Sequence, residues 1–401
     1  MDATCALRVR ECGARWPRRL PMPDHDPRTF PDPATAPPYA ARLHALADAS
    51  LTAATGQRAA QVDAELVAGL RTLLDPSAGD RLSQAFATAP SATICRHLWR
   101  MLVLSERTAE RDDALGITMF AVPLVLVAGQ EGGGDAQTSL SGVLDDAAAL
   151  AAILRDHGAL GGNLTFTLAN VLVGAAAIEL PRLPELLARR ALPDDGMPPL
   201  DFEPAPMVQL PGQEGVHMRF LVGGALSARS ADLLGQTSVG AWGMPFTQAI
   251  GRQLSAPGLP VLALPRVPQP LSAALRDGRA AHREVAAQLF ASNAIRKLRA
   301  SVGEPTAVIS MHRTPDAPTG GEVRLSLSSP FDSREAEGFR CPLFAFDRIP
   351  DVVTMLRDLL RDCRVNEVHV LPGVHGDRDA ATGLPLLFKG ENLPEADSRV
   401  H

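Results

Sequence analysis

The spacing of apolar residues changes period along this chain, and that change limits the folds it can adopt. Before Gly116, apolar residues recur every three or four positions, as at Val62, Leu66 and Leu70, which is the pattern of a helix with one buried face. After Gly116 the largely apolar and partly β-branched run 117–127 indicates a buried strand. Loop, helix and strand patterns then follow, which indicates a layered fold rather than a helical bundle.

We therefore predict an α/β fold, with a mixed α+β arrangement as the alternative. A helical N-terminal unit precedes an internally repetitive α/β region that ends in a βαβ unit. We expect a disordered Arg- and Pro-rich tail at 1–38, followed by the helical unit at 39–113 and an α/β region at 114–270 that could contain an internal duplication. A long amphipathic helix at 271–301, a C-terminal α/β unit at 302–390 and a flexible tail at 391–401 complete the chain.

Composition excludes several classes of protein. The 401 residues correspond to two or three domains of about 150 residues each, and 46% hydrophobic residues can form sizeable cores. A net charge of −6 argues against a protein that coats nucleic acid. The longest apolar run, interrupted by Pro123, is shorter than the roughly 20 residues of a membrane span. We expect a soluble globular protein.

Residue usage also suggests a compartment and a source. The five cysteines are scattered and form no C-x-x-C pair, which fits a reducing compartment such as the cytoplasm and predicts no metal site. Arginine far outnumbers lysine, which occurs only at Lys297 and Lys389, and this bias is typical of a high-GC bacterial genome. In the tail no apolar segment follows the arginines, so we favour a disordered arm over a targeting peptide or a translation start at Met22.

Three similar turns suggest an internal repeat. The segments 181–184, 265–268 and 347–350 each end in proline, contain an arginine and start 84 and 82 residues apart. When the chain is aligned with itself over its middle part, Gly116 matches Gly215, which is a shift of 99 residues. This shift differs from the spacings of 84 and 82 residues between the turns, so duplication stays an open alternative. The arginines of the turns are expected to form salt bridges between strand and helix, or alternatively to contact an anion.

A long helix, opened by Pro270, is predicted over 271–301. One side is apolar and the other basic, so it could dock an acidic partner or nucleic acid, although a solvated face is the simpler interpretation. The predicted partner-binding residues are Arg276, Arg279, Arg283, Arg296, Lys297 and Arg299.

The C-terminal unit gives the clearest prediction. Strands at 307–310 and 323–327 flank a turn-rich segment and form a hairpin, and the strand 343–346, a helix over 351–363 and the strand 367–371 form a βαβ unit with parallel strands. Ligands bind such sheets beyond the carboxyl ends of the strands.

Polar residues follow both strands of that βαβ unit. The candidate catalytic residues are Asp347 and Arg348 after the first strand, and His375 and Asp377 after the second. These side chains could act as a general base with carboxylate partners or, with Asp379, as ligands of a hard metal ion. The alternative is a polar surface loop without a function.

No motif identifies a reaction or a cofactor, since the glycine-rich segment 129–134 lacks P-loop spacing and no G-x-S-x-G or H-E-x-x-H motif occurs. Our first hypothesis is a non-enzymatic bacterial protein that assembles with itself or serves as a scaffold for other proteins. The alternative is a hydrolase or transferase of a small anionic substrate at the C-terminal sheet edge. A second alternative is a regulatory module whose basic helix binds an acidic partner or nucleic acid, of which nucleic acid is the less expected partner.

Overall fold

A computed structural model of the chain places the segments described below. It describes residues 26–107, 116–128, 138–140, 142–161, 164–188, 200, 202–205, 208–210, 215–227, 235, 237–255, 260–301, 303–315, 317–329, 336–376 and 386–389.

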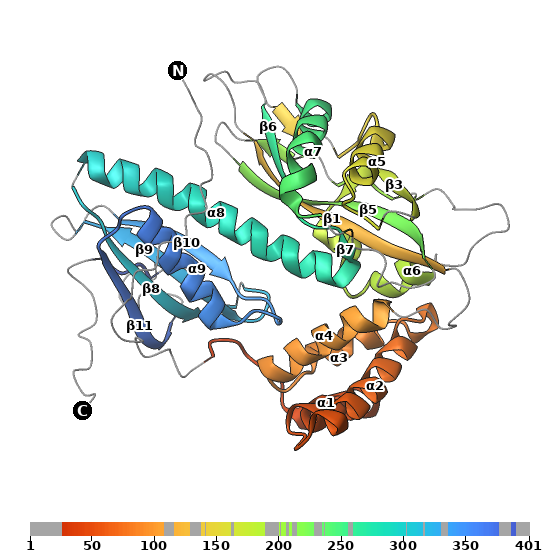
Figure 1. The fold of residues 1–401 in the computed structure, drawn as a ribbon. Coiled ribbons are helices and arrows are strands. Elements are labelled where there is room, and N and C mark those ends of the chain that lie inside the picture. Colours follow the sequence, from red (N-terminus) through yellow and green to blue (C-terminus); the bar gives the residue numbers. More distant parts are fainter. Residues whose placement is uncertain are drawn as a thin grey trace.

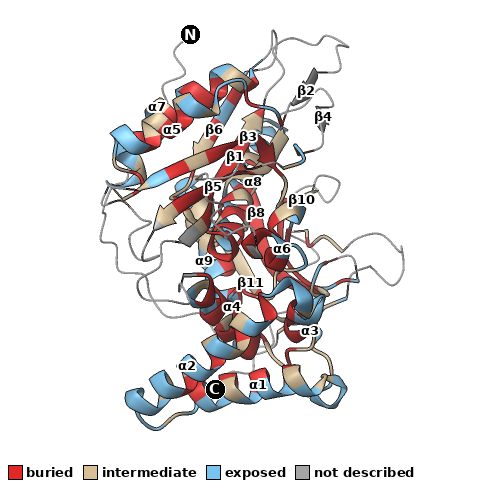
Figure 2. Cartoon of the chain, turned by 90° about the vertical axis from the view of Figure 1, so that its right-hand side faces the viewer, coloured by how far each residue is buried: buried red, intermediate tan, exposed pale blue. Residues whose placement is uncertain are grey.

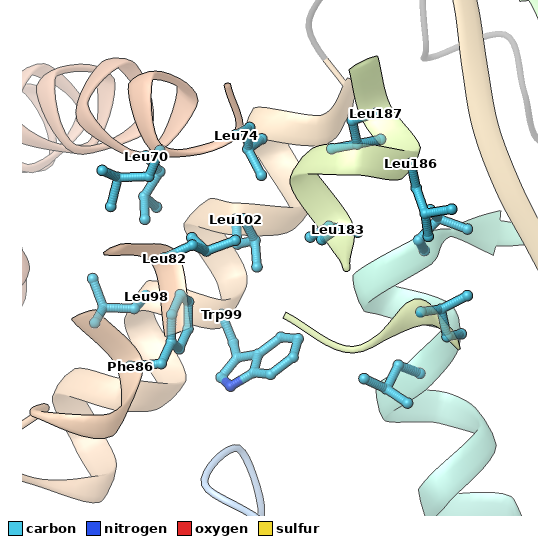
Figure 3. Packing of buried hydrophobic residues seen from close by; sticks show 14 of the residues in the cluster. Leu70, Leu74, Leu82, Phe86, Leu98, Trp99, Leu102, Leu183, Leu186 and Leu187 are labelled. Atoms are coloured by element: carbon cyan, nitrogen blue, oxygen red, sulfur yellow. The ribbon is translucent and has the colours of Figure 1, made fainter. Parts of the chain in front are cut away.

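The N-terminal unit is helical. It contains η1 (Pro33–Thr35), α1 (Pro38–Leu51), α2 (Gly56–Leu73), η2 (Pro76–Ala78), α3 (Arg81–Ala87) and α4 (Ala92–Arg107). The Thr55 side chain accepts a hydrogen bond from the backbone N–H of Arg58 and so caps α2. The apolar faces of these helices meet around Leu70, Leu98 and Trp99, and leucines of α6 (Leu183–Ala188) close the cluster (Figure 3).

An antiparallel sheet follows. Its strands are β1 (Gly116–Ala128), β3 (Thr165–Val173), β5 (Gly215–Ser227), β6 (Val261–Pro265) and β7 (Gln269–Pro270), in the order β3-β5-β1-β6 with β7 also paired to β1. A separate pair is formed by β2 (Thr138–Leu140) and β4 (Val208–Leu210), and the remaining helices of this region are α5 (Ala147–Asp156), η3 (Ala175–Ile178) and α7 (Val239–Leu254).

Both faces of this first sheet are covered. On β1, Val122 and Leu124 pack in the same cluster as residues of α5 and α7, whereas Met119 and Ala121 pack in the cluster of the N-terminal helices and the start of α8. Two buried faces explain why the run 117–127 is apolar at almost every position rather than at every second one.

The long helix α8 (Leu271–Ser301) leads into the C-terminal unit. That unit contains β8 (Thr306–Arg313), β9 (Gly321–Ser328), β10 (Ala336–Pro342), α9 (Ile349–Asp362) and β11 (Glu367–His375). The strand order is β10-β9-β8-β11, with β11 parallel to β8 and the other neighbours antiparallel. The first half of α8 packs on the first sheet and its second half on the C-terminal sheet, so α8 joins the two (Figure 1).

The structure confirms the predicted α/β class, with a helical N-terminal region followed by sheets. The internal repetition is not confirmed. Of the three similar turns only the one at Pro265 follows a strand; the one at Pro181 follows η3.

Two predicted elements differ in detail. Residues 343–346 form a turn instead of a strand. Arg28 donates hydrogen bonds to the carbonyl oxygens of Phe344 and Ala345, and the Asp347 carboxylate accepts one from the backbone N–H of Phe344, so these groups are not free for a sheet. The strand that enters the βαβ unit is β10, which runs parallel to β11 but is separated from it by β9 and β8.

The predicted N-terminal tail is partly ordered. Residues 1–25 lie outside the described residues, whereas Arg28 is only 4% exposed and the backbone N–H of Thr29 donates to the carbonyl oxygen of Thr319. Exposed residues concentrate instead on the outer sides of α1 and α2 (Figure 2). None of the helices described is long and apolar enough to span a membrane.

Candidate functional site

The segment 343–348, which we call the hub loop, connects β10 to α9. Its conformation depends on Asp347, whose carboxylate oxygens accept hydrogen bonds from Arg283 Nη2 at 2.8 and 2.9 Å. One of these oxygens also accepts from the backbone N–H of Phe344 at 2.7 Å. Both charged side chains are buried, at 7% and 8% exposure. The ion pair therefore fixes the hub loop against α8.

Arginines from the N-terminal unit bind the other side of the hub loop. Arg28 Nη1 donates to the carbonyl oxygens of Phe344 and Asp347, at 2.9 and 3.0 Å, and its charge is balanced by Asp26. Arg96 of α4 donates to the same Asp347 carbonyl at 3.4 Å. The hub loop is thus the point where the N-terminal segment, α4, α8 and α9 meet.

A cleft of about 500 Å³ opens beside the hub loop, and we call it the arginine cleft. Its charged lining consists of five arginines and four carboxylates from α4, α8 and the hub loop with the start of α9. The full lining is Arg96, Trp99, Arg100, Arg276, Asp277, Ala280, Arg283, Glu284, Phe346, Asp347, Arg348, Asp351, Val352 and Met355.

The four carboxylates neutralise only part of the charge of the five arginines that line the cleft. Both oxygens of Asp347 are engaged by Arg283, and Asp277 lies 3.6 Å from Arg266, which is not part of the lining. Asp351 is 3.7 Å from Arg348, but both side chains are more than 60% exposed, and such pairs contribute little. Positive charge therefore remains available in the cleft.

Two arginines show most directly that the cleft has more positive than negative charge. Arg276 forms no ion pair with any residue that the structure describes. Burial lowers the pKa of Arg96, and the neighbouring charges of Arg28 and Arg348 lower this pKa further. Like charges gathered at one place are electrostatically costly, and a bound anion would relieve that cost.

Arg283 supplies the strongest indication of a missing partner. Its Nη2 is held by Asp347, but its Nη1 is buried and has no hydrogen-bond partner among the residues described. A buried polar group without a partner costs about 1–3 kcal/mol, and more when it is charged.

A second cavity, of about 520 Å³, lies on the other side of Trp99 and Phe346, which line both cavities; we call it the aromatic pocket. Five rings contribute to its lining, and the polar groups include one ion pair, Arg279–Glu179. The rings are those of Phe30, Phe86, Trp99, Phe344 and Phe346.

The rings of the aromatic pocket contact one another. Trp99 and Phe346 are edge to face, with ring centroids 5.2 Å apart, and Phe344 stacks on Phe346 at 5.7 Å. Phe86 meets Trp99 edge to face at 5.2 Å, and both side chains are visible in Figure 3. The guanidinium of Arg279 lies 4.1 Å above the Phe344 ring, which is a favourable cation–π position.

The structure brings only some of the predicted site residues together. Asp347, Arg348, Arg276 and Arg283 line the arginine cleft, and Arg279 lines the aromatic pocket. Arg28, Arg96 and Trp99 were not predicted, because their roles depend on contacts between distant segments. The only signal in the sequence was a tryptophan with arginines three positions before it and one after.

His375 lies elsewhere. It pairs in register with His312 of β8, on the sheet face opposite α8, whereas Asp347 contacts α8. The predicted sheet-edge site with Asp347, Arg348 and His375 side by side is therefore not formed. Asp377 and Asp379 lie outside the described residues.

The predicted basic face of α8 is also divided. Arg296, Lys297 and Arg299 lie toward the far end of the helix from the cleft. Lys297 pairs with Glu337, and Arg299 pairs with Glu304 at 3.0 Å. The six basic residues thus form two groups rather than one continuous docking surface.

A histidine cluster covers part of the other face of the C-terminal sheet. Ser310 Oγ lies 2.9 Å from His312 Nε2, and His312 Nδ1 lies 3.0 Å from the Gly376 carbonyl oxygen. A carbonyl oxygen can only accept, so Nδ1 donates and Nε2 is left to accept the Ser310 hydroxyl proton in the neutral imidazole. Ser310 and His312 are 1% and 0% exposed beneath Phe388, so this pair is closed to a substrate.

Within the described part of the chain, no group of three or more histidine, cysteine or acidic side chains is placed to hold a metal ion. Comparisons with protein-family models, with curated proteins and with solved structures find no significant match to this chain. The function is therefore argued from the geometry of the two cavities.

Proposed function

We propose that the protein binds a small phosphate-like oxyanion in the arginine cleft. The observation that carries the proposal is the charge of the cleft's lining, where five arginines meet four carboxylates and Arg276 forms no ion pair with a described residue. Arg96 and Arg348 line the same cleft and add to its positive charge.

Local structure supports the same conclusion. Arg348 is the N-cap residue of α9, so it lies at the positive end of a 14-residue helix, where an anion is stabilised. Asp347 uses both carboxylate oxygens to hold Arg283 and the hub loop. Asp347 therefore acts here as a positioning residue and not as a general base. Glu284 and Asp351, exposed at the rim, would disfavour anions of high charge.

Isothermal titration calorimetry with inorganic phosphate, at constant ionic strength, tests the proposal. Charge-assisted hydrogen bonds contribute about 1.5–3 kcal/mol, so Arg348→Gln or Arg276→Gln should weaken phosphate binding about tenfold or more. Arg361→Gln is the matched control, because Arg361 is an exposed arginine of α9 that pairs with Asp358. Absence of phosphate binding, or equal weakening by the control, would overturn the proposal.

Self-assembly or a scaffold role in a bacterial cytoplasm stays a prediction from the sequence. One structural feature favours it. Among the described strands, β6 lies at an edge of the first sheet, and its Leu262 is half exposed. Unpaired edges of sheets are common places for chains to associate.

A further inference from the structure

The sheet face opposite α8 and α9 carries a row of buried polar side chains on two neighbouring strands. On β8 these are Ser310 and His312, and their partners in the register of β9 are Arg324 and Glu322. Each of the four is at most 2% exposed. Buried polar groups are costly, and the apolar side chains that alternate with them already form a core on the α8 side. The polar row is therefore a candidate for a chemical role.

Ser310 and His312 have the geometry of a nucleophile and its general base. Ser310 Oγ lies 2.9 Å from His312 Nε2, and His312 Nδ1 donates a hydrogen bond to the carbonyl oxygen of Gly376 at 3.0 Å. That bond keeps the proton of the neutral imidazole on Nδ1, so Nε2 is the nitrogen that takes the hydroxyl proton. A hydroxyl, an imidazole and an acceptor behind the imidazole are the parts that activate a serine.

Arg324 supplies a positive charge on the strand next to Ser310. Residues directly opposite each other on antiparallel strands have Cβ atoms about 4.5–5.5 Å apart. The guanidinium pairs with Glu322, and its Nη1 donates to the carbonyl oxygen of Leu386 at 3.2 Å. This arginine therefore already binds a carbonyl oxygen. A fixed donor in that position would stabilise the oxyanion that forms when a serine attacks a carbonyl carbon.

Residues 386–389, which we call the C-terminal strap, lie over the polar row. The carbonyl oxygen of Leu386 is bound by Arg324, and the ring centroid of Phe388 lies 6.1 Å from that of His312. The strap contains no helix or strand, and its apolar cluster is small and separate from the main cores. The members of that cluster are Val308, Leu371 and Phe388, with Leu386 packed against them. A segment held by so small a cluster can open while the sheet stays folded.

We propose that Ser310 and His312 form a latent ester-hydrolysing site, which the C-terminal strap inhibits by occupying the place of the substrate. The Leu386 carbonyl oxygen stands where the carbonyl oxygen of the substrate binds. Phe388 fills the position of an apolar acyl group beside Val308. The site is independent of the proposed anion binding, which uses the arginine cleft beside α8.

The reaction needs only an ester and water. When the strap opens, Ser310 Oγ bonds to the ester carbonyl carbon, the hydroxyl proton passes to His312 Nε2, and the carbonyl electron pair moves to the oxygen that Arg324 stabilises. The return of that pair breaks the bond to the alcohol, which leaves with the proton from Nε2. Water then attacks the acyl group on Ser310 in the same way, which releases the carboxylic acid and restores the serine.

An alkyl fluorophosphonate tests the site, because an activated serine bonds to its phosphorus and displaces fluoride. The full-length parent protein should react slowly at Ser310, since the strap must open first. Phe388→Ala removes the main apolar contact of the strap and should speed the labelling of Ser310 about tenfold or more. Leu386→Ala loosens the strap at its other apolar side chain and should act in the same direction. Peptide mapping by mass spectrometry identifies the labelled serine.

Two further changes in the Phe388→Ala protein distinguish an activated serine from one that is merely uncovered. His312→Gln should slow the labelling of Ser310 about a hundredfold or more, because the general base is lost. Ser326→Ala is the matched control, because it removes another fully buried serine of the same sheet face, and it should leave the labelling unchanged. Hydrolysis of p-nitrophenyl butyrate should follow the same order of variants.

Several outcomes would overturn the proposal. One is that Ser310 is labelled in neither the parent nor the strap variants, or that folded strap variants are labelled no faster than the parent. Another is that His312→Gln does not slow the labelling. A labelled Ser310 in a Phe388→Ala protein that hydrolyses no ester would show that the site is not an esterase.

Discussion

At the scale of single residues, the buried pair Arg283–Asp347 determines whether the hub loop keeps its conformation. The carboxylate joins α8 to the backbone of Phe344, so loss of either partner leaves the other charge buried without its counterion. Removing one member of a buried ion pair costs about 3–5 kcal/mol, far more than an exposed pair contributes.

We expect Arg283→Met and Asp347→Asn each to lower the free energy of unfolding by about 3 kcal/mol. The double variant should lose clearly less than the two single losses added together, because neither charge then lacks its partner. Urea denaturation of the four proteins measures this coupling. Strictly additive losses would mean that the two charges do not stabilise each other.

At the scale of elements, α8 can lie against the first sheet only because Gly278 has no side chain. A Cβ at this position would come within 2.8 Å of the Phe220 ring on β5 and within 3.2 Å of the Pro123 side chain on β1. Helix propensity alone would favour alanine by up to about 1 kcal/mol. The close approach of α8 to the sheet opposes that gain.

We expect Gly278→Ala to destabilise the protein, since overpacking a core costs about 1–3 kcal/mol. Gly240→Ala is the control, because this glycine of α7 is exposed and its Cβ would meet only Ser238 Oγ, at 3.5 Å. That control should be neutral or stabilising by up to about 1 kcal/mol. Thermal denaturation compares the two, and a gain in stability for both would show that α8 is free to move off the sheet.

At the scale of the whole molecule, three histidines on different elements make stability depend on pH. Burial lowers the pKa of His217 on β5, His282 on α8 and His375 on β11 below 6.5. Arg219 and Arg283 lower the first two further, while carbonyl oxygens of Val216 and Pro372 partly oppose the shifts at His282 and His375. The folded chain therefore takes up protons less readily than the unfolded chain.

The stability that these histidines contribute is complete above pH 6.5 and is lost as pH falls through their lowered pKa values. We expect the free energy of unfolding to decrease from pH 7.5 to pH 5, and His375→Leu to make that decrease shallower. The pKa of Glu367 is lowered chiefly by its hydrogen bond to His369, so the stability that Glu367 contributes is lost only at a lower pH than that of the histidines. A flat profile between pH 7.5 and 5 would contradict the prediction.

The sequence by itself determined the elements whose signals are local. Pro270 and the apolar spacing after it place α8 at 271–301, and the run after Gly116 places β1. Turn residues between two strand patterns place the hairpin of β8 and β9. These patterns are local because helix and strand periods follow from backbone geometry within a few residues.

Only the tertiary structure decided which of the predicted site residues lie together. Arg283 belongs to a basic pattern typical of a solvated face, yet it is buried because the hub loop packs on that side of α8. His375 reaches His312 because a register shift in β11 between Val370 and Val374 carries it there, on the sheet face opposite Asp347. Local sequence sets the period of a segment, but its partner and its buried face depend on segments far away in the sequence, 64 residues in the case of Arg283 and Asp347. The two cavities beside the hub loop exist only where those segments meet.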